Sequence, residues 1–226
     1  MKQVTKALMA GILVLGLGQA SLAAEPRSEP SYDLLFRDGT LDAVPRAEKI
    51  TYQRQVEITA APDMAAHNTG VIELSFTGGA PETVRLQFFQ DEKYRKLGDF
   101  PASVGNPMIM YFMESIIRDM ATTTGGSPFY IRNRLKNALI TPADIEDSSI
   151  DVNGTSLPAQ HVILRPFEGD PNAERMDGFA DLEMHVIMSE DIPGWYHSLR
   201  AEVPVTADQA QIYSNVISFQ MAGAVQ

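Results

Sequence analysis

The sequence predicts an α+β fold in which a curved antiparallel β-sheet of about eight or nine strands, shaped like half of a barrel, wraps around a two-helix hairpin. Three observations support this prediction. Segments with the period of two that is typical of strands lie on both sides of one stretch, 106–139, whose apolar residues follow a helical period. The links between successive strands are short, as in antiparallel neighbours. Both helices are amphipathic and must bury one face, for which the sheet offers the surface.

The N-terminal residues have the three parts of a secretory signal peptide. Two lysines precede an apolar run from Ala7 to Gly18, and small residues follow at the expected cleavage position. We expect a signal peptide over 1–23, an extended N-terminal segment over 24–45 and a single α+β domain over 46–226. The apolar run is too short to span a membrane, and the chain has no cysteine for a lipid anchor or a disulfide. The expected location is therefore the periplasm, without membrane span or lipid anchor.

The chain of 226 residues is acidic, with a formal net charge of −11. This balance argues against a nucleic-acid partner and against binding to anionic lipid through bulk charge. A chain of this length can bury an ordinary core without disulfides. Any function should therefore depend on a particular site.

The first strand is predicted from Lys49, where Ile50, Tyr52, Val56 and Ile58 fall on one side. Arg54 occupies the same apolar row. We expect it to lie at a strand end or to pair with a carboxylate of the hairpin, and the candidates are Asp119 and Glu114. Further strands are predicted at 71–77, 83–89, 93–97, 150–152, 160–165, 180–189, 195–203 and 211–221. The acidic residues just after the hairpin are interpreted as a solvated loop, and they are Asp144, Glu146 and Asp147.

The helical hairpin carries clear start and stop signals. Asn106-Pro107 offers a capping side chain and a proline at the first helical position, Gly125-Gly126 ends the first helix, and Ser127-Pro128 begins the second. The apolar residues at helical spacing are Ile109, Phe112, Met113, Ile116, Ile117 and Met120 in the first helix, and Phe129, Leu135, Ala138 and Leu139 in the second.

Three segments carry a resemblance to known proteins. Ser103–Phe112, Thr124–Arg134 and Ile192–Tyr196 (SVGNPMIMYF, TGGSPFYIRNR and IPGWY) resemble uncharacterised exported proteins of Gram-negative bacteria, over nearly the whole mature chain. This resemblance implies an exported protein and brings no activity with it. The order of elements is also similar to that of the periplasmic lipoprotein-carrier half-barrels, which implies an architecture and no function.

Two sets of side chains are candidates for binding. The first would line the seam between sheet and hairpin, where its adaptable methionine and aromatic side chains could accept an apolar small molecule, a lipid or a lipidated partner; it comprises Met108, Phe112, Met113, Phe129 and Trp195. The second is a cluster of cations on the second helix, which either forms an anion or partner surface or complements the helix end and aids solubility; it comprises Arg132, Arg134 and Lys136.

Catalytic and metal-binding signatures are weak. The methionines at 108, 110 and 113 could ligate Cu(I), but they do not share one helix face, and the four histidines lack the short spacings of a zinc site. No nucleophile-elbow motif is present. We therefore expect no metal, no cofactor and a non-enzymatic protein that binds an apolar or amphipathic ligand. The alternatives are a structural or adaptor protein of the cell envelope with a closed core, and a hydrolase whose triad is not visible in the sequence.

Overall fold

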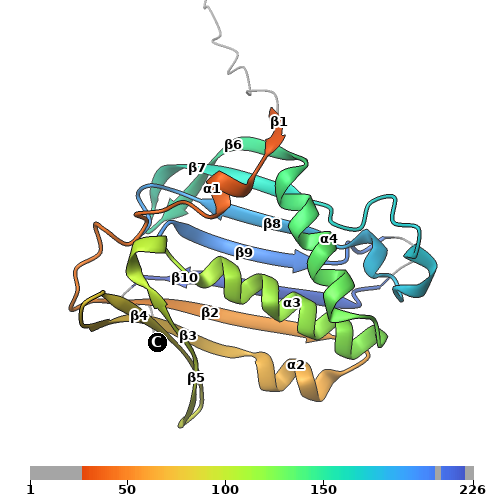
Figure 1. Cartoon of the computed structure of the whole chain (residues 1–226), viewed down its shortest axis with the longest axis horizontal. Coiled ribbons are helices and arrows are strands. Elements are labelled where there is room, and N and C mark those ends of the chain that lie inside the picture. The colour runs from red at the N-terminus through yellow and green to blue at the C-terminus, as the bar shows by residue number, and fades with distance from the viewer. Residues whose placement is uncertain (1–26, 207–209, 222–226) are drawn as a thin grey trace, which may run out of the picture.

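One antiparallel sheet of ten strands organises the molecule (Figure 1). The computed structural model describes residues 27–206 and 210–221, so the predicted signal peptide lies outside the described residues. The strand order is β1-β6-β7-β8-β9-β10-β2-β3-β4-β5. The strands are β1 (Arg27–Pro30), β2 (Lys49–Ile58), β3 (Gly70–Gly78), β4 (Thr83–Gln90), β5 (Lys93–Pro101), β6 (Pro142–Val152), β7 (Thr155–Leu164), β8 (Glu183–Met188), β9 (Tyr196–Glu202) and β10 (Tyr213–Gln220).

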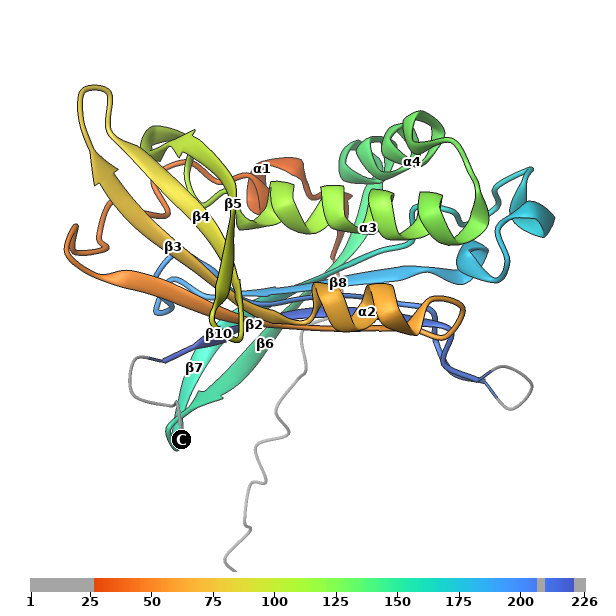
Figure 2. The ribbon, with the colours of Figure 1, turned by 90° about the horizontal axis from the view of Figure 1, so that it is seen from below.

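The helices are α1 (Tyr32–Leu35), α2 (Pro62–Asn68), α3 (Met108–Thr124) and α4 (Pro128–Ile140), with short 3-10 turns η1 (Ala102–Val104), η2 (Ala173–Arg175) and η3 (Phe179–Asp181). Helices α1, α3 and α4 lie on one side of this sheet, and α2 lies level with it at the connection from β2 to β3 (Figure 2). Helix α3 runs along the sheet, and α4 crosses above it as the outermost layer. The described sheet is open, because β1 and β5 form its two edges. The predicted α+β class, with a curved antiparallel sheet around a helix pair, is confirmed. No helix in the described ranges has both the length and the apolar character needed to cross a membrane.

The last strand closes the gap left by the helical hairpin. β10 pairs antiparallel with β2 on one side and with β9 on the other, for example through Tyr213 opposite Ile58 and Asn215 opposite Ala201. It thus joins the strands before the helices to those after them. Alternate residues of these strands face the helices and are buried, as the period of two predicts.

The predicted helix boundaries are confirmed to within one residue, since α3 begins at Met108 and Pro107, expected as its first residue, is its N-cap residue. Asn106 Oδ1 accepts a hydrogen bond from the backbone N–H of Met108 at 3.0 Å, and its Nδ2 donates to the Tyr52 hydroxyl and the Gly194 carbonyl, each at 2.8 Å. The Asn106 side chain therefore accepts from the first N–H of α3 and fastens the start of the helix to β2 and to the turn before β9. Gly125 ends α3 in the left-handed region with φ of 68°. Ser127 caps α4 by accepting from Tyr130 N at 3.4 Å.

The N-terminal segment is not extended throughout. β1 pairs with β6, and a turn of helix, α1, follows it. Leu35 of α1 is fully buried, and Ser31 N donates to the Leu139 carbonyl at 3.1 Å. Trp195 Nε1 donates to the Leu34 carbonyl at 3.2 Å, and the Tyr196 hydroxyl donates to the Leu35 carbonyl. Ser31 thus fastens the start of α1 to the end of α4, and Trp195 and Tyr196 fasten α1 to the start of β9.

Three details differ from the sequence prediction. The described sheet has ten strands instead of eight or nine, because β1 and a longer β6 belong to it. Asp144, Glu146 and Asp147 lie in β6 and not in a loop. Ala143 and Ile145, on either side of Asp144, are buried and hold the strand against the helices. Helix α2 was not predicted, although Pro62 at its first position and Asp63 in its first turn are helix-start signals.

Candidate ligand-binding groove

The seam between α3 and the sheet is filled by core side chains. Met108, Phe112 and Ile116 of α3 are each 0% exposed, and they pack in one cluster with the inward residues of the strands. The predicted seam residues Met108 and Phe112 are therefore part of the core. Whether either contacts a ligand stays a prediction.

A buried polar network sits in the same seam, around Arg54. The Arg54 guanidinium donates to Asn215 Oδ1 at 3.1 Å, to the Tyr111 hydroxyl at 2.8 Å and to Asp119 Oδ2 at 3.4 Å. Arg54 and Asp119 are 0% and 3% exposed. The predicted pairing of Arg54 with Asp119 is confirmed, and it explains how a charged residue occupies an apolar row.

The remaining polar atoms of this network also have partners. Asp119 accepts from the Tyr213 hydroxyl at 3.2 Å, and Asn215 Nδ2 donates to Ser115 Oγ at 2.9 Å. Burial raises the pKa of Asp119, while the charge of Arg54 and the hydrogen bond from Tyr213 oppose that rise. The network ties α3 to β2 and β10, and the closed seam leaves the search for a binding site to other surfaces.

A groove of about 760 Å³ lies on the other side of α3. Met110 and Asp119 are nine residues apart, which corresponds to a rotation of about 180° around a helix. The groove therefore opens away from the buried network. Four elements line it, namely α1, β5, α3 and α4. Figure 2 places α1, α3 and α4 on the same side of the sheet, of which β5 is an edge strand.

The groove is mostly apolar. Its inner lining consists of Met113 and Ile117 of α3 with Leu135 and Leu139 of α4. The outer walls are Tyr32 of α1 and Phe36 just after it, Leu97 and Phe100 of β5, and Ile140 of α4. Ile140 is 65% exposed and Tyr32 is 48% exposed, so part of this apolar surface faces water. The volume lies within the range of small-molecule sites, about 300–1,000 Å³.

Charged side chains stand along the groove between the two helices. Arg132 of α4 makes a two-point ion pair with Glu114 of α3, with Nε to Oε1 at 2.9 Å and Nη2 to Oε2 at 2.8 Å. Arg118 and Lys136 also line the groove. Within the described ranges, neither of them makes an ion pair. Three cations and one carboxylate leave an excess of two positive charges at this site, in a chain whose net charge is −11.

The electrostatics of Glu114 reflect this excess. Its pKa is lowered, chiefly by the hydrogen bonds from Arg132 and also by the charges of Arg132, Arg118 and Lys136, against the opposing effect of partial burial. All three cations thus act on one point of the groove. A second anionic group placed there would meet the same field.

The structure brings together some of the predicted site residues and separates others. Met113, Arg132 and Lys136 line the groove. Arg134 points to the other side of α4, where its Nε lies 2.8 Å from Asp170 Oδ2. Trp195 is 5% exposed and supports α1 from below, outside the groove lining. Its predicted ligand contact stays untested.

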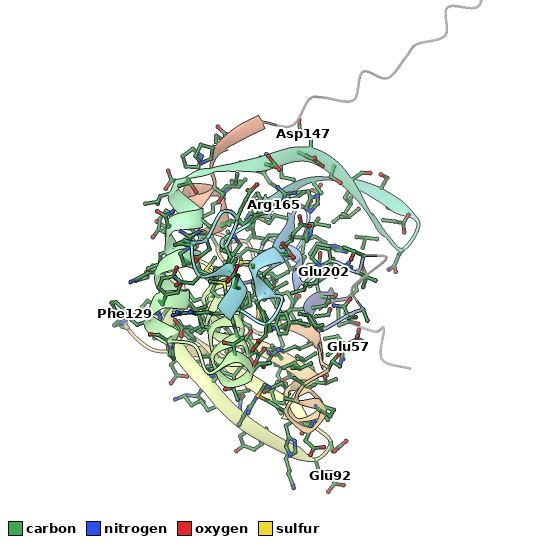
Figure 3. All side chains as sticks on the ribbon, turned by 90° about the vertical axis from the view of Figure 1, so that its right-hand side faces the viewer. Glu57, Glu92, Phe129, Asp147, Arg165 and Glu202 are labelled. Atoms are coloured by element: carbon green, nitrogen blue, oxygen red, sulfur yellow. The ribbon has the colours of Figure 1, made fainter. Side chains whose placement is uncertain are left out.

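The predicted place of Phe129 in the apolar stripe of α4 is wrong. Its side chain is 70% exposed and points away from the sheet (Figure 3). The buried stripe consists of Ile131, Leu135, Ala138 and Leu139. Phe129 precedes Ile131 by two residues, a rotation of about 200° at 100° per residue, which places it on the opposite face.

The sequence prediction missed the other groove residues. Tyr32 and Phe36 belong to the segment expected to be extended, and Leu97 and Phe100 come from an edge strand. Glu114 and Arg118, four residues apart on the polar side of α3, were a detectable signal, because such spacing places two charges side by side. What the sequence lacked was the crossing of α4 over α3 that brings Arg132 to the same point.

A metal site or a serine–histidine catalytic site has little support among the described residues. His161 and His185 touch on the strand face away from the helices, with Nε2 to Nδ1 at 3.1 Å. No group of three or more histidine, cysteine, aspartate or glutamate side chains in residues 27–206 and 210–221 could hold a metal ion. In the same ranges, no hydrogen bond joins a serine to a histidine.

Comparisons with known proteins add a distant fold likeness. No protein-family model matches the chain, and no curated protein matches it. Among solved structures, the crystal structure of the Mycobacterium tuberculosis lipoprotein LppX is similar with a TM-score of 0.36 and 10% sequence identity, over 85% of this chain and 95% of that chain. A likeness at this level says nothing about function. Function has to be argued from the groove.

Proposed function

We propose that this protein binds, without catalysis, an amphiphile that has an apolar chain and an anionic head, in the groove formed by α1, β5, α3 and α4. The observation that carries the proposal is the union of an apolar lining with an excess of two positive charges in a chain of net charge −11. In view of the predicted signal peptide, the site would act in the periplasm.

The apolar part of the ligand would cover surface that now faces water. Ile140 and Tyr32 are 65% and 48% exposed beside the buried Leu135 and Leu139. Removing apolar surface from water contributes about 25 cal/mol per Å². A flexible chain can follow the walls of the groove, and Met110 and Met113 can adjust their shape to it.

The anionic head would lie near Arg118 and Lys136. Both cations lack an ion-pair partner within the described residues, whereas Arg132 is held by Glu114. A carboxylate, sulfate or phosphate head could therefore gain two charge contacts without breaking an existing pair. A neutral apolar molecule would leave these cations unused, which favours the anionic class.

The same structure bears on the adaptor alternative. An adaptor protein was expected to have a closed core, and the filled seam between sheet and helices agrees with that expectation. The groove lies outside that seam, so a closed core and a ligand site are compatible in this fold. A ligand test on the groove therefore separates the two functions.

The test uses a fluorescent long-chain fatty acid below its micelle concentration and the protein purified after export. Met110→Trp places a larger side chain in the groove and should weaken binding at least tenfold. Val205→Trp, at a site that is 61% exposed and outside the groove lining, should leave binding unchanged. Equal binding by both variants, or no binding by the unmodified protein, would refute the proposed function.

A further inference from the structure

We propose that the outer face of α4 docks on an anionic lipid bilayer and presents the groove to it. This inference rests on the proposed function, because it names the surface from which the amphiphile would enter and leave. It starts from the charge of α4, which contains Arg132, Arg134 and Lys136 and no acidic residue. Arg132 and Arg134 are paired with Glu114 and Asp170, so Lys136 is the cation of this helix that makes no ion pair within the described residues.

The outer face of α4 also carries apolar side chains at both ends. Phe129 near its start is 70% exposed, and Ile140 at its end is 65% exposed. Phe129, Lys136 and Ile140 fall within about 40° of one another around the helix. This stripe, which we call the α4 stripe, therefore has one large apolar residue at each end and a cation between them.

The α4 stripe lies on the outermost layer of the molecule. Figure 2 shows α4 farther from the sheet than α3, and Figure 3 shows Phe129 projecting from that side. A flat surface approaching the helices would therefore contact α4 first. Exposed phenylalanine and isoleucine beside lysine are the residues that interfacial helices place in the headgroup region.

The α4 stripe is continuous with the groove. Lys136 and Ile140 belong to both, and Arg118 and Tyr32 extend the cationic and apolar surface toward α1. An acyl chain could pass from a bilayer that contacts Ile140 into the groove with little exposure to water. A protein partner would not need this continuity, which favours a lipid surface.

The remaining charge of the molecule would orient it. Figure 3 shows Glu57 and Glu202 on the side opposite to Phe129. It shows Glu92 at the tip of the β4–β5 hairpin. An anionic bilayer repels the side that carries Glu57 and Glu202 and attracts the local cations of α4, whereas the β4–β5 hairpin carries Lys93, Arg95 and Lys96 beside Glu92.

The experiment is co-sedimentation of the purified protein with extruded vesicles at low salt. Vesicles of phosphatidylcholine with one third phosphatidylglycerol should bind the protein at least tenfold more tightly than phosphatidylcholine alone, and 0.5 M salt should abolish the difference. Phe129→Asp and Ile140→Asp should each reduce binding at least fivefold. Tyr94→Asp is the matched control, because Tyr94 is 67% exposed on β5 and should tolerate the change.

Two outcomes would overturn the docking proposal. One is equal sedimentation of Phe129→Asp and Tyr94→Asp. The other is that the unmodified protein binds neither kind of vesicle; if the α4 variants then lose binding to a protein, α4 docks on that protein and not on a bilayer. Phe129 does not line the groove, so Phe129→Asp should still bind the monomeric fatty-acid probe. Vesicle binding without probe binding would instead reject the groove function and retain the docking surface.

Discussion

Charged side chains are paired on the sheet side of α3 and partly unpaired on its groove side. On the sheet side, Arg54 and Asp119 are almost completely buried, and tyrosine, asparagine and serine side chains satisfy them. On the groove side, Arg118 and Lys136 face an apolar hollow and make no ion pair within the described residues. Tyr111 touches both regions, since its hydroxyl accepts from Arg54 and its ring centroid lies 5.9 Å from the Arg118 guanidinium.

This contrast separates structure from function. A buried charge without partners would destabilise the fold, so the sheet side must be complete before any ligand arrives. An exposed cation beside an apolar wall lowers the stability of the fold little when it is unpaired, so it remains available to bind a ligand. The completed network is therefore expected to govern stability, and the incomplete groove is expected to govern binding.

Breaking the buried network should have the largest effect. Arg54→Met leaves the Asp119 carboxylate buried without its cation, and we expect the free energy of unfolding to fall by about 3–5 kcal/mol. Urea denaturation followed by circular dichroism measures this change. The double variant Arg54→Met with Asp119→Leu should recover part of the loss, because no charge is then left buried.

The groove supplies the control for that experiment. Arg132→Met removes an ion pair whose side chains are 35% and 49% exposed, so we expect a loss below about 1 kcal/mol. If Arg132→Met costs as much as Arg54→Met, the division between a structural face and a binding face of α3 is wrong.

The buried network and the groove also differ in how well the sequence predicted them. The helix pair, its caps at Asn106, Gly125 and Ser127, and the partner of Arg54 all follow from local signals: a capping side chain, a glycine, and a charge in an apolar row. The strands of the sheet were predicted from the alternation of apolar and polar residues. These features depend on residues close in sequence or on the need to satisfy a buried charge.

The groove could not be predicted in the same way. Its walls come from α1, β5, α3 and α4, and their meeting depends on the crossing of the helices and on how Trp195 and Tyr196 hold α1. Phe129 was misplaced because it was grouped with Leu135 and Ala138, although it lies about 240° and 180° from them around the helix. Periodicity identifies which face is buried but not where two helices leave a hollow between them.

Reversing one groove charge should have a smaller effect, confined to binding. Lys136→Glu replaces an attraction for an anionic head by a repulsion, and we expect the fatty-acid probe to bind about tenfold more weakly. Isothermal titration calorimetry measures the affinity. Lys93→Glu carries the same change of charge on the exposed β4–β5 hairpin and should shift the affinity less than twofold if the effect is local. Similar losses for both variants would mean that total charge, and not the groove, controls binding.

The smallest effect concerns Glu114 and its pH dependence. Because Arg132 lowers the pKa of Glu114, this carboxylate keeps its charge below about pH 4.3, where an ordinary glutamate is half protonated. It therefore repels an anionic head at neutral pH and ceases to do so only as the pH falls through the lowered pKa.

An alkyl sulfonate, whose head stays charged in acid, is the suitable probe for this effect. Its affinity, measured by fluorescence competition, should rise about threefold through that range, since one exposed like-charge contact of about 0.7 kcal/mol is removed. Glu114→Gln should show the higher affinity already at pH 7 and no such rise in acid. A rise of the same size in Glu114→Gln would assign the pH dependence to another group. The head would then lie away from the α3–α4 ion pair.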